Sequence, residues 1–191
     1  YKLGHVTGIN ITPLHVEVGR DPVKEHGKED KIDLQLGDGV DMKFQDNAFD
    51  KVVCLESAFH FDTREAFFRE SLRVLKPGGK FALTDMLPAP GKKTDRFLQK
   101  AGRKNICIPD ANMYDRFAYV EKLKEAGFTN VKVTSIAHHV YPGSAKYASS
   151  RFFEKQDMSK VVIELTRDEI NNCTGVERWE ESLGISDYVL A

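Results

Sequence analysis

Short apolar segments of strand length alternate with helical segments along this chain, and this alternation limits the fold more than any other feature. Residues 52–55 (Val-Val-Cys-Leu) form a continuous apolar run, which is typical of a strand covered on both faces. Residues 64–75 have the apolar spacing of a helix, which residues 77–79 (Pro-Gly-Gly) end before a strand at residues 80–84. Strand and helix alternate about five times with short connections, which favours a doubly wound α/β sheet.

Further segments extend this pattern towards both ends of the sequence. Residues 5–9 and 32–36 are strand-like, and between them Thr12 and Pro13 are typical of a helix start. A later helix is predicted with one apolar face formed by Phe117, Val120 and Leu123. Residues 187–190 are predicted as a last strand. We therefore expect a Rossmann-like sheet, mostly parallel with an antiparallel C-terminal strand, and helices on both faces.

The composition agrees with a single domain over residues 1–191. Hydrophobic residues make up 41% of the chain, and 28 Lys+Arg against 29 Asp+Glu give a net charge of −1. A near-neutral chain without basic runs lacks the charge that nucleic acids and acidic membranes attract, so we expect a small-molecule partner. Residues 89–113 follow the carboxyl end of a strand and are predicted to form a lid over the active site.

The cysteines and the apolar runs indicate the compartment. Cys54, Cys107 and Cys173 are far apart and lack the spacing of a disulfide framework or a zinc site, so we expect no metal. No apolar run approaches the roughly 20 residues that span a bilayer, and no leader pattern opens the chain. A cytoplasmic protein without membrane insertion is expected.

Four sequence motifs carry a resemblance to a known family. They are residues 8–12 (Gly-Ile-Asn-Ile-Thr), 37–39 (Gly-Asp-Gly), 49–53 (Phe-Asp-Lys-Val-Val) with 56–60 (Glu-Ser-Ala-Phe-His), and 72–79 (Leu-Arg-Val-Leu-Lys-Pro-Gly-Gly). In this order they resemble the class I S-adenosylmethionine-dependent methyltransferases, especially the small-molecule branch of ubiquinone/menaquinone, tocopherol and natural-product enzymes. The family's glycine-rich first strand-turn would precede Tyr1, so we expect this domain to lack its N-terminal part.

The resemblance implies that S-adenosylmethionine binds at the first two motifs. Asn10 stands where the family usually has an Asp or Glu for the ribose hydroxyls, and its amide can both accept and donate hydrogen bonds. Asp38 stands at the adenine-contacting position, where a carboxylate can accept from an exocyclic amine. The alternative for both residues is that they only stabilise turns. The further cofactor-binding positions implied are Ile11, Gly37, Gly39, Leu55 and Glu56, although Glu56 could instead pair with an arginine.

His60 and Asp85 are the predicted catalytic residues. His60 follows the strand at the edge where the cofactor's methyl group would point, and several members of the resembled branch use a His in this segment as the base. Asp85 ends the neighbouring strand, where it could orient His60 or bind substrate. The alternatives are a structural histidine and a capping aspartate.

Together these observations predict methyl transfer from S-adenosylmethionine to a small-molecule O, C or N acceptor. A nicotinamide-dependent oxidoreductase on a similar sheet is one alternative, and a non-catalytic binding subunit with a methyltransferase fold is another. A nucleic-acid methyltransferase is disfavoured, because residues 54–57 lack the Asn/Asp-Pro-Pro-aromatic motif of the amino-methylating enzymes. The sequence also allows a homodimer.

Overall fold

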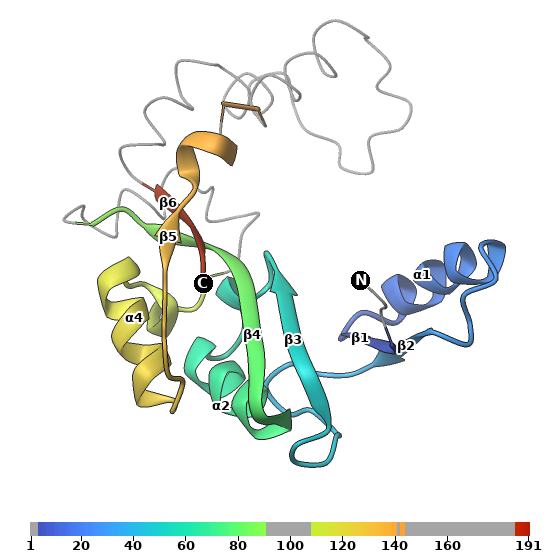
Figure 1. Ribbon diagram of the computed structural model, residues 1–191. Coiled ribbons are helices and arrows are strands. Elements are labelled where there is room, and N and C mark those ends of the chain that lie inside the picture. The colour runs from blue at the N-terminus through green and yellow to red at the C-terminus, as the bar shows by residue number, and fades with distance from the viewer. Residues whose placement is uncertain (1–3, 91–107, 141, 144–185) are drawn as a thin grey trace, which may run out of the picture.

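The computed structural model describes residues 4–90, 108–140, 142–143 and 186–191 (Figure 1). Strands β1 (Val6–Asn10) and β2 (Ile32–Leu36) pair in parallel, and helix α1 (Pro13–Glu25) connects them. Pro13 lies in the first turn of α1, where its missing N–H costs nothing. This strand–helix–strand unit confirms the parallel pairing predicted for the N-terminal part of the chain.

The remaining strands form a four-stranded sheet in the order β3-β4-β6-β5. β3 (Phe49–Leu55) and β4 (Leu75–Pro88) are parallel, whereas β6 (Ser186–Leu190) is antiparallel to β4 and to the short β5 (Thr134–Ser135). The predicted α/β fold class is therefore confirmed, including the antiparallel C-terminal strand.

Helices α2 and α4 and two short 3-10 turns lie beside this sheet. The turn η1 (Ala58–His60) leads into α2 (Arg64–Val74), which packs against β4. The turn η2 (Asp110–Asn112) precedes α4 (Arg116–Glu125), which packs against α2. None of the described helices combines the length and the apolar character that crossing a membrane requires.

Side-chain caps explain where α2 and α4 begin. The Thr63 hydroxyl accepts a hydrogen bond from the backbone N–H of Ala66, and the Asp115 carboxylate accepts from Phe117 and Ala118. Gly127, with φ +108°, follows the end of α4 in a conformation that favours glycine. These caps fix the helix ends beside the sheet.

The structure differs from the sequence prediction at residues 75–79. Leu75 is predicted as the end of a helix and residues 76–79 as a turn, but all of them form the first part of β4. The register is irregular there, because Phe49 pairs with Leu75 whereas Lys51 pairs with Lys80. Gly78, with φ +78°, provides the bend that this irregularity needs. Of the predicted lid, residues 91–107 lie outside the described residues.

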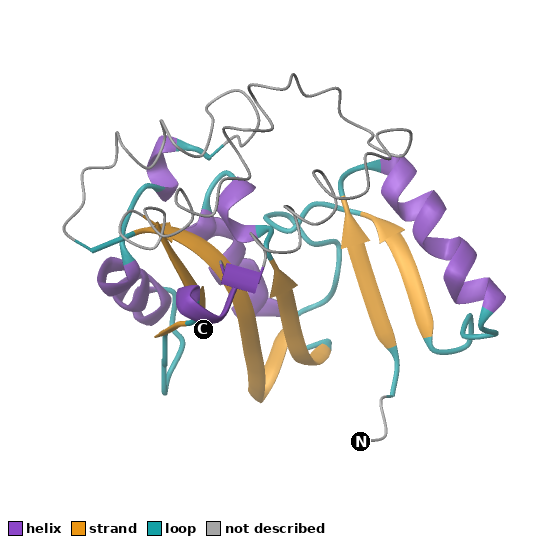
Figure 2. Ribbon diagram, turned by 90° about the horizontal axis from the view of Figure 1, so that it is seen from above, coloured by secondary structure: helices purple, strands orange, loops and turns teal. Residues whose placement is uncertain are grey.

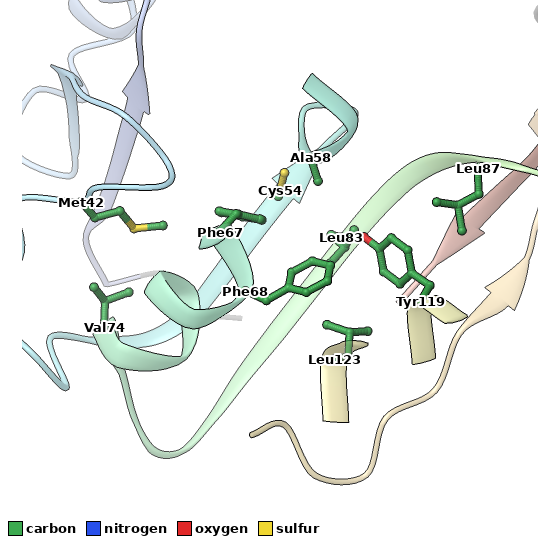
Figure 3. Packing of buried hydrophobic residues seen from close by; sticks show 10 residues of the cluster. All are labelled: Met42, Cys54, Ala58, Phe67, Phe68, Val74, Leu83, Leu87, Tyr119 and Leu123. Atoms are coloured by element: carbon green, nitrogen blue, oxygen red, sulfur yellow. The ribbon is translucent and has the colours of Figure 1, made fainter. Parts of the chain in front are cut away.

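The core lies between α2, α4 and the sheet (Figure 3). Its buried residues are Met42, Cys54, Ala58, Phe67, Phe68, Val74, Leu83, Leu87, Tyr119 and Leu123. The Phe68 ring packs edge-on against Tyr119, with ring centroids 5.3 Å apart. Complete burial of a phenylalanine side chain such as Phe68 stabilises a fold by roughly 1.5–3 kcal/mol. This cluster holds β3, β4 and the two helices together.

Strands β1 and β3 flank an opening between the two sheets, and their arrows run the same way (Figure 2). Among the described residues, β1 pairs only with β2, and the only strand paired with β3 is β4. Large apolar side chains are exposed on both sides of this opening, including Val6 on β1 and Val53 and Leu55 on β3. The opening is therefore bounded by two strand edges with apolar neighbours.

Candidate active site

A cavity of about 550 Å³ occupies the opening between β1 and β3. The carboxyl ends of both strands contribute to its wall, and this is the edge at which open α/β sheets bind ligands. The predicted site residues that line it are Asn10, Ile11, Gly37, Gly39, Leu55 and His60. Topology explains this convergence, because the carboxyl ends of parallel strands meet at one edge.

Asn10 is the last residue of β1, and its exposed side chain stabilises the turn into α1. Its Oδ1 accepts a hydrogen bond from the backbone N–H of Thr12 over 2.8 Å. This is the Asx-turn geometry considered as the alternative for Asn10. The side chain also lines the cavity, so the turn and a ligand contact are compatible.

Asp38 has a similar local role in the turn after β2. Its Oδ1 accepts from the backbone N–H of Val40 over 3.0 Å, and the residue is exposed. Asp38 itself is not part of the cavity lining, whereas both neighbouring glycines are. At Gly39 a Cβ atom would lie 3.0 Å from the ring of Phe61. Glycine therefore allows this turn to pack closely against the segment that carries His60.

Glu56 adopts an uncommon backbone conformation at the end of β3. Its φ of +50° lies in the left-handed region, which residues with a side chain occupy rarely. Its backbone N–H donates to Thr84 over 3.1 Å, which keeps this bend attached to β4. Such strain tends to occur at functional sites, and here it turns the chain directly into η1.

His60 ends η1 at the cavity wall. Its side chain is exposed, and its ring packs against Phe59 with centroids 4.1 Å apart. The Cys54 thiol also lines the cavity, but burial raises its pKa to about 11. A thiol with such a pKa is protonated at neutral pH and is a poor nucleophile. Of these two groups, only His60 is suited to exchange protons with a ligand.

Asp85 lies apart from the cavity lining, in a fully buried polar cluster. Its Oδ2 accepts from Arg64 Nε over 2.8 Å and from the Tyr119 hydroxyl over 2.9 Å. Burial acts to lower the pKa of Arg64, but the charge and hydrogen bond of Asp85, together with Tyr119 and Tyr114, outweigh it and the pKa is raised. The guanidinium also lies over the rings of Tyr114 and Tyr119. Asp85 thus neutralises a buried cation, and its predicted contact with substrate stays a prediction.

Sequence reasoning did not find Arg64 or Asn112, which form the rest of this cluster. Arg64 begins a helix whose pattern is amphipathic, so nothing in its neighbourhood indicates a buried charge. Asn112 lies in a short 3-10 turn, and both residues are completely buried. The one available signal was Asp85 itself, since a carboxylate after an apolar strand needs a partner when it is buried.

The fold and the cavity define a doubly wound α/β domain with a ligand site at the strand ends. A solved structure with this fold is a putative sarcosine dimethylglycine methyltransferase from Galdieria sulphuraria. It has a TM-score of 0.80 and 20% sequence identity, with 97% of this chain and 68% of that one covered.

Sequence comparisons identify the family. Residues 1–83 match a family model described as a methyltransferase domain. The chain is 34% identical over 145 residues to the erythromycin 3''-O-methyltransferase of Saccharopolyspora erythraea, covering 73% of this chain and 47% of that enzyme. It is 35% identical over 126 residues to a sterol 24-C-methyltransferase of Gibberella zeae, covering 65% and 33%. Residues 1–83 therefore match the methyltransferase domain family, and the chain is similar to class I S-adenosylmethionine-dependent methyltransferases. It spans less than half the length of these two relatives.

Proposed function

We propose that this protein transfers the methyl group of S-adenosylmethionine to an O, C or N atom of a small molecule. The observation that carries the proposal is the cavity between β1 and β3, in which Asn10, Gly39 and His60 come together from three motifs of the family. Its volume of about 550 Å³ is within the range of small-molecule sites. The two relatives are named for O- and C-methylation, so their names leave the acceptor atom open.

The residues present fit a nucleoside-containing cofactor. Ile11 and Leu55 line the cavity with side chains that are 68% and 67% exposed, which is unusual for large apolar residues and is relieved when a flat base covers them. Asn10 would hold the ribose hydroxyls, and Asp38 would accept from the adenine amine. Gly37 and Gly39 line the cavity without a side chain, so the cofactor could approach the backbone there. Glu56 supplies the bend between β3 and η1. The cofactor, when bound, supplies an electrophilic methyl group on its sulfonium.

The chain's own contribution is to position the acceptor and to take up its proton. Methyl transfer is an in-line displacement, so the nucleophile has to be held at about 3–3.5 Å from the methyl carbon. His60 would act as the general base for an acceptor whose nucleophile carries a proton, because it is exposed on the cavity wall. Asp85 would support the site from behind through its ion pair with Arg64, and a direct contact with substrate stays a prediction.

We also propose that residues 89–113 form a lid. The described parts at both ends support this role, because Met86 on one side and Ile108 and Met113 on the other pack around Phe59. Phe59 precedes His60, so both ends of the segment are anchored beside the proposed base. A lid at this place would exclude water during the transfer.

One more parallel strand between β1 and β3 would complete the sheet. The exposed apolar residues Val53 and Leu55 and the two strand edges that face the cavity support this. Hydrogen exchange tests it on the full-length protein and on residues 1–191. The cavity-facing amides of β1 and β3 should exchange more slowly in the full-length protein. Equal rates in the two proteins would rule the strand out.

Calorimetry with the full-length protein tests the proposed function. We expect saturable binding of S-adenosylmethionine and no binding of NADH, followed by formation of S-adenosylhomocysteine with a panel of small-molecule acceptors. NADH binding instead would favour an oxidoreductase, and failure to bind S-adenosylmethionine would overturn the proposal. Binding without product on any acceptor would favour a non-catalytic subunit. Light scattering on the same sample tests the expected homodimer, and cell fractionation tests the cytoplasmic location.

A further inference from the structure

The buried side chain of Asn112 donates hydrogen bonds to the carbonyl groups of the two residues that flank His60. Its Nδ2 donates to the carbonyl of Phe59 over 3.2 Å and to the carbonyl of Phe61 over 2.7 Å. Its Oδ1 accepts from the backbone N–H of Arg64 over 3.0 Å. One fully buried amide thus connects the turn η1 to the first residue of α2.

The turn that carries His60 depends on such support. η1 is a single 3-10 turn, closed by the bonds from His60 N–H to Ser57 and from Phe61 N–H to Ala58. Short 3-10 turns have poor hydrogen-bond geometry and little cooperativity, so they do not fix their own orientation. Asn112 adds two hydrogen bonds that leave the turn on either side of His60, which fixes the direction of its Cα–Cβ bond.

Asn112 is itself held by Arg64. The Arg64 Nη1 group donates to the Asn112 carbonyl, and Nη2 donates to the carbonyl of Met86 over 3.0 Å. The Asp85 carboxylate fixes the same guanidinium from β4. Every polar atom of the Asn112 side chain is therefore used in a dry environment, where a well-satisfied network is rigid.

We propose that Asn112 is a positioning residue that sets the orientation of His60 in the cavity, with Arg64 and Asp85 as its support. This inference rests on the proposed function, because it assigns catalytic meaning to the orientation of His60. It also explains why a carboxylate and an arginine are buried behind the site. Their role is to hold a neutral amide in place.

Two variants separate the effect of the hydrogen bonds between Asn112 and η1 from an effect on general stability. Asn112→Ser keeps an oxygen that can accept from the Arg64 N–H, but the serine side chain is too short to reach the carbonyls of both Phe59 and Phe61. Asn112→Ala removes every hydrogen bond of the side chain. Tyr119→Phe is the matched control, because it removes one hydrogen bond of the same buried cluster without touching η1. Where Asn112→Ala does not fold, Asn112→Ser supplies the comparison.

The first measurement needs no acceptor. Hydrogen exchange of the His60 and Phe61 amides should accelerate about tenfold or more in the Asn112 variants, because η1 loses the hydrogen bonds from the Asn112 side chain. Exchange at these two amides should not change in Tyr119→Phe beyond the change in global stability. Unchanged exchange in both Asn112 variants would overturn the inference.

The second measurement relates the hydrogen bonds between Asn112 and η1 to turnover. Asn112→Ser should lower kcat by about 10²-fold with little change in the affinity for S-adenosylmethionine, as expected for a misplaced group. Combined with His60→Ala it should cause no further loss, because both changes act through the same base. Additive losses would overturn the inference. Unchanged turnover in His60→Ala alone would instead overturn the proposed base, whereas the exchange result tests the hydrogen bonds from Asn112 to η1 independently of the base.

Discussion

Arg64 and Asp85 form an ion pair in which both side chains are fully buried, with Nε 2.8 Å from Oδ2. The pair joins the start of α2 to the C-terminal part of β4. Taking two charges out of water costs several kcal/mol per ion, and the attraction between them offsets this only when the remaining polar atoms are also satisfied. The Tyr119 hydroxyl and the carbonyls of Met86 and Asn112 supply those partners.

Asp85→Asn should therefore lower the free energy of unfolding by about 3–5 kcal/mol, because it leaves the Arg64 charge buried without a counter-ion. Urea denaturation of both proteins measures this difference. The control is Asp50→Asn, whose ion pair with Lys76 is exposed and should contribute less than about 1 kcal/mol. An equal effect of the two substitutions on the free energy of unfolding would contradict the assignment of Arg64 and Asp85 as a buried ion pair.

The ion pair between Glu70 and Arg73 should make the stability of the protein depend on pH. A hydrogen bond from Arg73 lowers the pKa of Glu70, so the pair stabilises the protein above the unfolded pKa of about 4.3. This contribution is lost as the pH falls through the lowered pKa. Glu70→Gln should cost about 0.5–1 kcal/mol at neutral pH and nothing at more acidic pH. Thermal melts across this range check it, and a difference that persists in acid would contradict it.

Asp38→Ala should weaken binding of S-adenosylmethionine by about 1–3 kcal/mol if the carboxylate contacts adenine. The substitution also removes the acceptor for the Val40 N–H. Asp38→Asn keeps an oxygen that can accept from the Val40 N–H and removes only the charge. Calorimetry that shows normal affinity in both variants would remove Asp38 from the cofactor site.

Asn10→Asp should leave cofactor binding intact or tighten it, because a carboxylate makes a stronger hydrogen bond to a ribose hydroxyl than an amide does. The aspartate can still accept from the Thr12 N–H, so the turn into α1 is kept. The same calorimetric titration measures the effect. A large loss of affinity would mean that Asn10 does not face the ribose.

His60→Ala should lower turnover by about 10²–10⁴-fold if His60 removes the acceptor's proton. Cofactor affinity and melting temperature should stay close to those of the unaltered protein, because the side chain is exposed. The loss should be smallest for acceptors that are already deprotonated. A normal rate per folded molecule in a less stable protein would show that His60 is structural.

Strand periodicity and family motifs predicted the part of the site that topology determines. Asn10 and His60 are far apart in the chain, but each lies at or beyond the carboxyl end of a parallel strand, so both were expected at one edge of the sheet. Local pattern could not predict the polar cluster. Phe117 was expected on the inner face of α4, yet it is 62% exposed, and Tyr119 is buried instead. The Tyr119 hydroxyl finds its partner in Asp85, a residue from another element, and this tertiary contact determines which face of α4 turns inward.

The position of β6 has a consequence for how the protein is made. β6 lies between β4 and β5 in the sheet, although residues 186–190 follow both strands in the chain. During synthesis, the edge of β4 that pairs with β6 therefore waits for a partner that emerges much later. Pairing of such distant segments is slow, and an unpaired edge is prone to join the wrong strand. The yield of folded protein is therefore expected to depend on how well a chaperone or neighbouring sequence protects this edge until β6 emerges.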